Sequence, residues 1–118
     1  MFRMFVLTKR KAGMSMEAFM DYYENKHSKL AASMSPLMRS YRRNYITPVQ
    51  WELAGGGEAP FDCIAEVCFD SEEDFRKNIE SVGSDPEKVA MIAKDEENLF
   101  DRSKTCTFIG QMRESKLT

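Results

Sequence analysis

The sequence predicts an α+β domain of the ferredoxin-like, split βαβ type, with a four-stranded antiparallel sheet and helices on one of its faces. Segments with strand-like alternation and segments with a helical apolar repeat follow one another in the order β-α-β-β-α-β, which is the order of that fold. The chain has 118 residues, of which 42% are hydrophobic, and this is enough for one core. We therefore interpret residues 1–118 as a single domain.

The first two elements are a strand and an amphipathic helix. Residues 2–9 are apolar on both alternating faces, which predicts a strand covered on both sides. Ser15 is placed to cap a helix that runs to about Met34, and Pro36 ends it. At 100° per residue, one face of this helix carries a stripe of large side chains and the only histidine: Met16, Phe19, Met20, Tyr23, His27, Leu30 and Met34.

His27 is the leading candidate for chemistry because it points with this apolar stripe. An imidazole has an unperturbed pKa of roughly 6.5, so it can take or give a proton near neutral pH. His27 also lies one helical turn from the phenol of Tyr23. A hydrogen-bonded core histidine without a catalytic role is the alternative interpretation of the same pattern.

The middle of the chain predicts two strands separated by a long loop. Residues 37–47 alternate with polar groups on both faces, among them Asn44 and Tyr45. Residues 48–60 hold a glycine triplet and Trp51, and such a loop is either a cover or a plain connection. Residues 61–69 form the clearest strand, in which Asp62 and Glu66 share one face.

Two further helices and a last strand complete the chain. Ser71 is placed to cap a short helix, and Asp85 with Pro86 begins the next one. Glu96 lies near the centre of the inward stripe of this second helix, and Asp95 lies at its edge. A carboxylate in such a position is either buried with a partner or faces a cavity. Residues 104–114 predict the last strand.

Charge and cysteine content exclude several classes of function. The net charge of −2 does not indicate a protein that binds nucleic acids or anionic membranes. No apolar window approaches the ~18 residues that a membrane span needs. Three cysteines without a C-x-x-C spacing fit a cytoplasmic protein. The chain has no recognisable metal-ligand spacing, and the glycine triplet does not lead into a helix as phosphate loops do. We therefore expect neither a metal nor an organic cofactor.

The sheet also predicts a homodimer. Helices on one side would leave the other face of the sheet bare, including the face that carries Ile64 and Cys68 between acids. Two copies that pack face to face would cover it and enclose an eight-stranded barrel.

Four segments together resemble a known family. They are F-x-x-Y-Y-x-x-x-H-x-x-L-A at 19–31, S-Y-R-R-N-Y at 40–45, F-D-C-I-A-E at 61–66 and K-D-E-E-N-L-F-D-R-S at 94–103. In this order they resemble the EthD-type dimeric α/β-barrel proteins, above all the fungal EthD-domain dehydratases and decarboxylases of aromatic polyketide pathways. The resemblance to muconolactone methylisomerases is more distant, because the strand cysteine expected there falls at Val67.

This resemblance implies a cofactor-free lyase that acts on an aromatic, polyketide-type small molecule. His27 would transfer protons, and Tyr45, Asn44 or Tyr23 would donate hydrogen bonds to a developing oxyanion. Asp62 or Glu96 would orient the imidazole or supply a second carboxylate. The predicted catalytic residues are thus His27, Asp62, Glu96 and Tyr45, and the predicted substrate contacts are Phe19, Met20, Tyr23, Asn44, Trp51, Asp95 and Phe100. A non-catalytic dimeric protein that binds aromatic molecules, an accessory protein and a methylmuconolactone-type isomerase are the alternatives.

Overall fold

A computed structural model describes residues 1–50 and 55–118. Its strands are β1 (Phe2–Thr8), β2 (Ser40–Tyr45), β3 (Cys63–Phe69) and β4 (Cys106–Gly110). Its helical elements are α1 (Met16–Tyr22), the π-helical η1 (Tyr23–His27), α2 (Ser28–Met34), α3 (Glu72–Gly83), α4 (Pro86–Glu96) and the 3-10 turn η3 (Arg102–Lys104). Trp51, a predicted substrate contact, lies outside the described residues.

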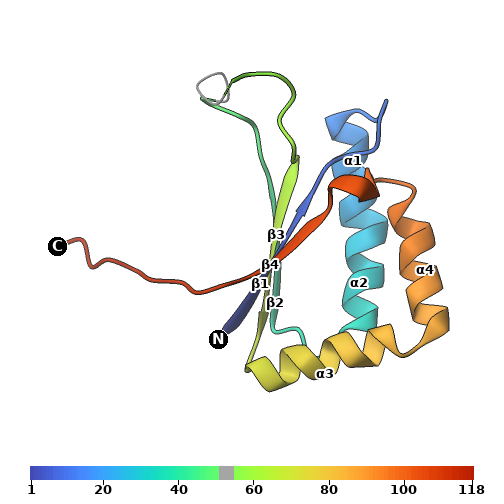
Figure 1. The fold of residues 1–118 in the computed structure, drawn as a ribbon, viewed down its shortest axis with the longest axis vertical. Helices are drawn as coiled ribbons and strands as arrows, with labels where there is room; N and C mark the ends of the chain where they lie inside the picture. Colours follow the sequence, from blue (N-terminus) through green and yellow to red (C-terminus); the bar gives the residue numbers. More distant parts are fainter. Residues whose placement is uncertain (51–54) are drawn as a thin grey trace.

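The strands form one antiparallel sheet in the order β2-β3-β1-β4. The helices lie on one face of this sheet, and residues 111–118 leave it on the side away from the helices (Figure 1). The predicted ferredoxin-like α+β fold is confirmed. β2 and β4 are shorter than the predicted ranges 37–47 and 104–114, because their ladders with β3 and β1 extend only over residues 40–45 and 106–110.

The first helical run is continuous from residue 16 to residue 34 but contains a π turn. The Ser15 hydroxyl accepts a hydrogen bond from the Ala18 amide, so the predicted N-cap is confirmed. The amide of Ser28 donates to the carbonyl of Tyr23, five residues back, which is the π pattern. Met20 is 39% exposed, and the prediction that it lies in the inward stripe is wrong. Phe19, which belongs to the same predicted stripe, is fully buried.

The later helices begin where their sequences predict. The Ser71 hydroxyl accepts from the Asp74 amide, and the Asp85 carboxylate accepts from the amides of Glu87 and Lys88. These caps satisfy amides that have no partner within the helix. In the part of the chain that the structure describes, no helix combines the length and the apolar composition that a membrane span needs.

The core consists of two clusters between the helices and the inner face of the sheet. One joins α1 and η1 to the segment after α4, and its members are Phe19, Tyr23, Cys63, Leu99 and Phe100. The other joins β3 to α3, and its members are Val67, Phe69 and Phe75.

Candidate functional site

A cavity of about 170 Å³ lies between the inner face of the sheet and the helices. Its apolar lining residues are Met4, Val6, Ala31, Met38, Ala65, Val67, Phe69, Ile92 and Phe100. Its polar lining residues are Tyr23, His27, Ser35, Tyr41, Asn78 and Glu96. An apolar cavity of about 150 Å³ accepts a benzene molecule, so this cavity has room for one aromatic ring.

His27 and Asp95 form a hydrogen-bonded pair at this cavity. The Nδ1 atom of His27 lies 2.8 Å from Oδ2 of Asp95, and the two side chains are only 7% and 15% exposed. A carboxylate only accepts hydrogen bonds, so it places the proton on Nδ1 and leaves Nε2 of a neutral imidazole unprotonated. The pair can therefore present a base to a molecule in the cavity.

The Asp95 carboxylate is itself held in place. Its second oxygen accepts a hydrogen bond from the Tyr22 hydroxyl at 2.6 Å, and Asn98 Nδ2 donates to that hydroxyl at 2.9 Å. The bond to Asp95, helped by burial, raises the pKa of Tyr22 above its ordinary value, so this phenol remains a donor. A carboxylate oriented in this way fixes the ring that it contacts.

Aromatic packing fixes the imidazole from other sides. Its ring lies edge-on to Tyr23 and Phe100, with centroids 5.2 Å and 5.0 Å away. His27 is also the last residue of the π turn, a feature that occurs frequently at functional sites. The prediction that His27 points inward with a carboxylate in reach is confirmed. The prediction that this carboxylate is Asp62 or Glu96 is wrong, because Asp95 at the edge of the helix stripe is the one that meets η1.

Three further polar groups line the same cavity near the core. Glu96 faces it and pairs with Arg102, whose Nε lies 3.4 Å from a carboxylate oxygen. Burial raises the pKa of both Tyr23 and Tyr41 above the ordinary phenol value, so both hydroxyls remain hydrogen-bond donors. Tyr41 is absent from the predicted site, although strand alternation places it on the same face of β2 as Tyr45.

The structure places Asp62 at a different end of the fold. Its carboxylate accepts a hydrogen bond from the Arg10 amide at 3.0 Å and lies 3.4 Å from Nζ of Lys9. Lys9 is buried and also contacts the Glu58 carboxylate at 2.8 Å. The structure therefore does not bring Asp62 to His27, and the Asp62 carboxylate instead compensates the cations that follow β1.

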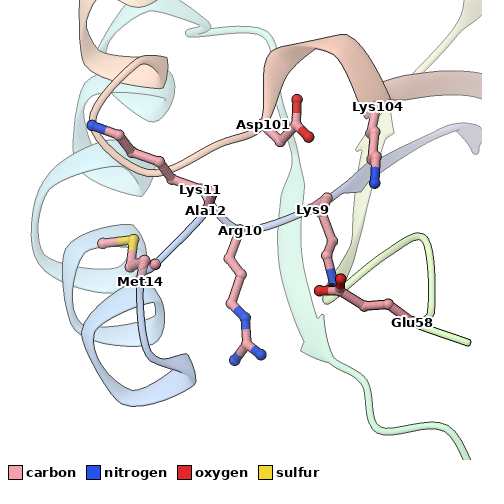
Figure 2. A pocket seen from close by; sticks show the side chains of 9 residues that line it. Lys9, Arg10, Lys11, Ala12, Met14, Glu58, Asp101 and Lys104 are labelled. Atoms are coloured by element: carbon pink, nitrogen blue, oxygen red, sulfur yellow. Dashed lines mark ion pairs between the residues drawn. The ribbon is translucent and has the colours of Figure 1, made fainter.

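A polar hollow of about 400 Å³ opens at this same end of β1. Figure 2 shows the Lys9 ammonium against the Glu58 carboxylate, while Lys11 and Lys104 point in different directions. The positive charges in this hollow therefore do not converge on a common point.

Tyr45 and Asn44 also have other partners. The Tyr45 hydroxyl donates to Glu24 at 2.5 Å, and Arg43 holds the same carboxylate through two hydrogen bonds. Asn44 is exposed and donates to the backbone of Ile64. Alternate residues of β2 point to opposite faces of the sheet, and Asn44 faces away from the helices. The structure therefore does not place Tyr45 and Asn44 in the lining of the His27 cavity.

The other predicted substrate contacts divide in a simple way. Phe100 and Tyr23 line the cavity. Phe19 is fully buried and packs against both of their rings, so it supports the cavity from behind. Within residues 1–50 and 55–118, no three His, Cys, Asp or Glu side chains gather in a way that could hold a metal ion.

Comparison with known proteins agrees with this architecture. The family model for the EthD domain matches residues 11–103. An EthD family protein from Bacillus halodurans is 18% identical with a TM-score of 0.64, over 96% of this chain and 100% of that one. A dimeric protein of unknown function and ferredoxin-like fold from Bacteroides fragilis is 14% identical with a TM-score of 0.56, and the match covers 94% of this chain and 95% of that one. A hydroxynitrile lyase from Passiflora edulis is 17% identical with a TM-score of 0.54, and the match covers 97% of this chain and 96% of that one. A search of curated proteins found no match.

Proposed function

The chain belongs to the EthD family, and on that premise we propose that it is a cofactor-free lyase that acts on a small aromatic molecule in the His27 cavity. The observation that carries this proposal is the His27–Asp95 hydrogen bond of 2.8 Å beside an apolar cavity of one-ring size. That a protein of the same fold is a hydroxynitrile lyase supports the choice of a lyase.

Dehydration of a β-hydroxy ketone illustrates the chemistry. Nε2 of His27 takes a proton from the carbon beside the carbonyl, and the electrons of that C–H bond form a C=C bond as the C–O bond breaks. The imidazolium then gives its proton to the leaving hydroxyl, so water departs and the imidazole is neutral again. Asp95 stabilises the imidazolium between these steps, and a neutral phenol of Tyr23 or Tyr41 donates to the carbonyl oxygen as charge develops there.

The charges around the cavity favour a neutral substrate. Among the described lining residues, Glu96 is a carboxylate and none is Lys or Arg. A substrate carboxylate would meet a like charge there, and the nearby cation, Arg102, is already paired with Glu96. This arrangement supports dehydration of a neutral molecule over decarboxylation of an acid.

The test uses the aldol of benzaldehyde and acetone, whose dehydration gives benzylideneacetone and is followed by ultraviolet absorbance. We expect wild-type turnover, and we expect His27→Ala to lower kcat by roughly 10²- to 10⁴-fold, which is the usual contribution of a proton-transfer group. The control is Lys26→Ala, an exposed neighbour on the same turn, which should behave as wild type.

Two results would contradict the proposal. If His27→Ala keeps full turnover per folded molecule and instead loses on the order of 1 to 3 kcal/mol of stability, the histidine is structural. If the wild type binds the aldol but neither dehydrates it nor exchanges its acidic C–H for deuterium, the protein is a binding protein.

We also propose that the protein is a homodimer formed through the outer face of the sheet. Phe5 pairs directly with Phe108, and Leu7 with Ile64, so these apolar side chains share the face that the helices leave open. Phe108 is 55% exposed, and the dimeric state of the Bacteroides fragilis protein supports the proposal. Light scattering should give twice 13.6 kDa, and Phe108→Asp should shift the protein toward monomer. A wild-type monomer at micromolar concentration would contradict it.

A further inference from the structure

The side chains of Asn78 and Ser35 line the cavity in addition to His27 and Glu96. Asn78 on α3 is only 8% exposed, and its Nδ2 donates to the hydroxyl of Ser35 at 3.3 Å. The hydrogen bonds among the described residues use no other polar atom of the Asn78 side chain, and Thr8 Oγ1 is the one enclosed side-chain atom there without a partner. The described residues therefore leave the remaining hydrogen-bonding capacity of this cavity-lining amide unused.

The direction of the amide does not change this conclusion. The nitrogen and oxygen of an asparagine can be exchanged by a flip of the side chain. In either orientation, one polar atom meets Ser35 and the other remains for a ligand. An amide both donates and accepts hydrogen bonds, and this capacity matches a neutral hydroxyl.

The two polar ends of the cavity lie along the same helical run. His27 ends η1 and Ser35 follows α2 directly, so Ser35 is eight positions after His27 in the chain. At about 1.5 Å per residue, their Cα atoms are about 12 Å apart along the axis. Ala31, midway between them, also lines the cavity with a small side chain and leaves room for a flat molecule.

We propose that Asn78 and Ser35 recognise a neutral hydroxyl on the aromatic ring of the substrate, on the carbon opposite the reacting side chain. An oxygen and a benzylic carbon on opposite sides of a benzene ring are about 6 Å apart, so with a contact of about 3 Å at each end such a molecule spans about 12 Å, which is similar to the separation of the two Cα atoms along the helix axis. This inference rests on the proposed function, because it takes the cavity to be the substrate site. It specifies the substrate class as a para-hydroxyphenyl compound.

The test measures binding of unreactive ketones and needs no turnover. The Kd values of acetophenone, para-hydroxyacetophenone and meta-hydroxyacetophenone are obtained from the ring signal of His27, the only histidine. We expect the para-hydroxyl to tighten binding to the wild type by about tenfold, and the meta-hydroxyl to do much less. In Asn78→Leu this gain, taken as the ratio of the acetophenone Kd to the para-hydroxyacetophenone Kd in the same variant, should fall to about twofold or less. Asn25→Leu, on an exposed turn, is the matched control and should keep the gain.

Ser35→Ala provides a second variant with a smaller packing change, and it should lose part of the para-hydroxyl gain even if Asn78→Leu fails to fold. Equal Kd values for the three ketones, a gain that persists in the variants, or no binding of any ketone would each overturn the inference. If the protein dehydrates the aldol while the ketones bind equally, only the role of Asn78 and Ser35 fails. If the para-hydroxyl preference depends on Asn78 but no lyase activity exists, only the proposed function fails.

Discussion

Replacing Asp95 with asparagine tests how much of the site depends on one negative charge. The carboxylate lies 2.8 Å from Nδ1 of His27, and at this distance two unit charges attract by about 6 kcal/mol at an effective dielectric constant of about 20. An asparagine oxygen can still accept the hydrogen bond, so we expect about half of this energy to be lost from the imidazolium state. Because 1.4 kcal/mol is a factor of ten, kcat should fall by about 10²-fold.

Two measurements make this prediction sharp. Nitrogen NMR of the ring should show the neutral imidazole protonated at Nδ1 in the wild type and a mixture of tautomers in Asp95→Asn, and with one histidine in the chain the assignment is unambiguous. Aldol dehydration then gives kcat. Asp21→Asn, an exposed aspartate on the same helical run as His27, is the matched control. A wild-type tautomer together with wild-type turnover in Asp95→Asn would refute the positioning role of Asp95.

Three further predictions concern stability and reactivity. Leu99 is fully buried, so Leu99→Ala should lower the free energy of unfolding by about 2 to 5 kcal/mol in urea titrations, whereas Val49→Ala at an 88% exposed position should change it by less than about 0.5 kcal/mol. Burial raises the pKa of the Cys63 thiol to about 12, so iodoacetamide at pH 8 should leave Cys63 unmodified in the native protein and alkylate it in urea; rapid native labelling, seen by mass spectrometry, would contradict this. The hydrogen bonds from Arg43 hold the pKa of Glu24 below its ordinary value, so the unfolded chain binds more protons and stability should be lost as the pH falls below about 4.5. Glu24→Gln should flatten this acid dependence, and an identical pH profile for the variant would disprove the linkage.

The sequence predicts the fold well because the signals for it are local. Ser15 and Asp85 are capping residues that act on amides two or three positions away, and strand alternation needs only a few neighbouring residues. His27 is also accessible to this reasoning, since helical periodicity alone directs it inward. These features do not depend on how two distant elements cross.

The partners within the site do depend on such crossings. Periodicity places Glu96 nearer than Asp95 to the centre of the helix stripe, yet the carboxylate that lies against His27 is that of Asp95. Asp62 shares no local signal with Lys9, and its position becomes evident only when β1 and β3 are in register. Tyr41 could have been found from its alternation with Tyr45, but only if the inward face of β2 were known.

The π turn is a place in the first helical run where the length of the chain can change without turning the helix. A π turn holds one residue more than an α-helical turn of the same path. A deletion of one residue among 24–26 would therefore leave every acid, base and phenol of the cavity present, and would convert the turn to a regular α-helix. Because the π turn already takes up the extra residue, the helix parts before and after the deletion would keep their relative orientation. His27 and Phe19 would then both still face the core, whereas a deletion in regular α-helix turns everything beyond it by about 100°.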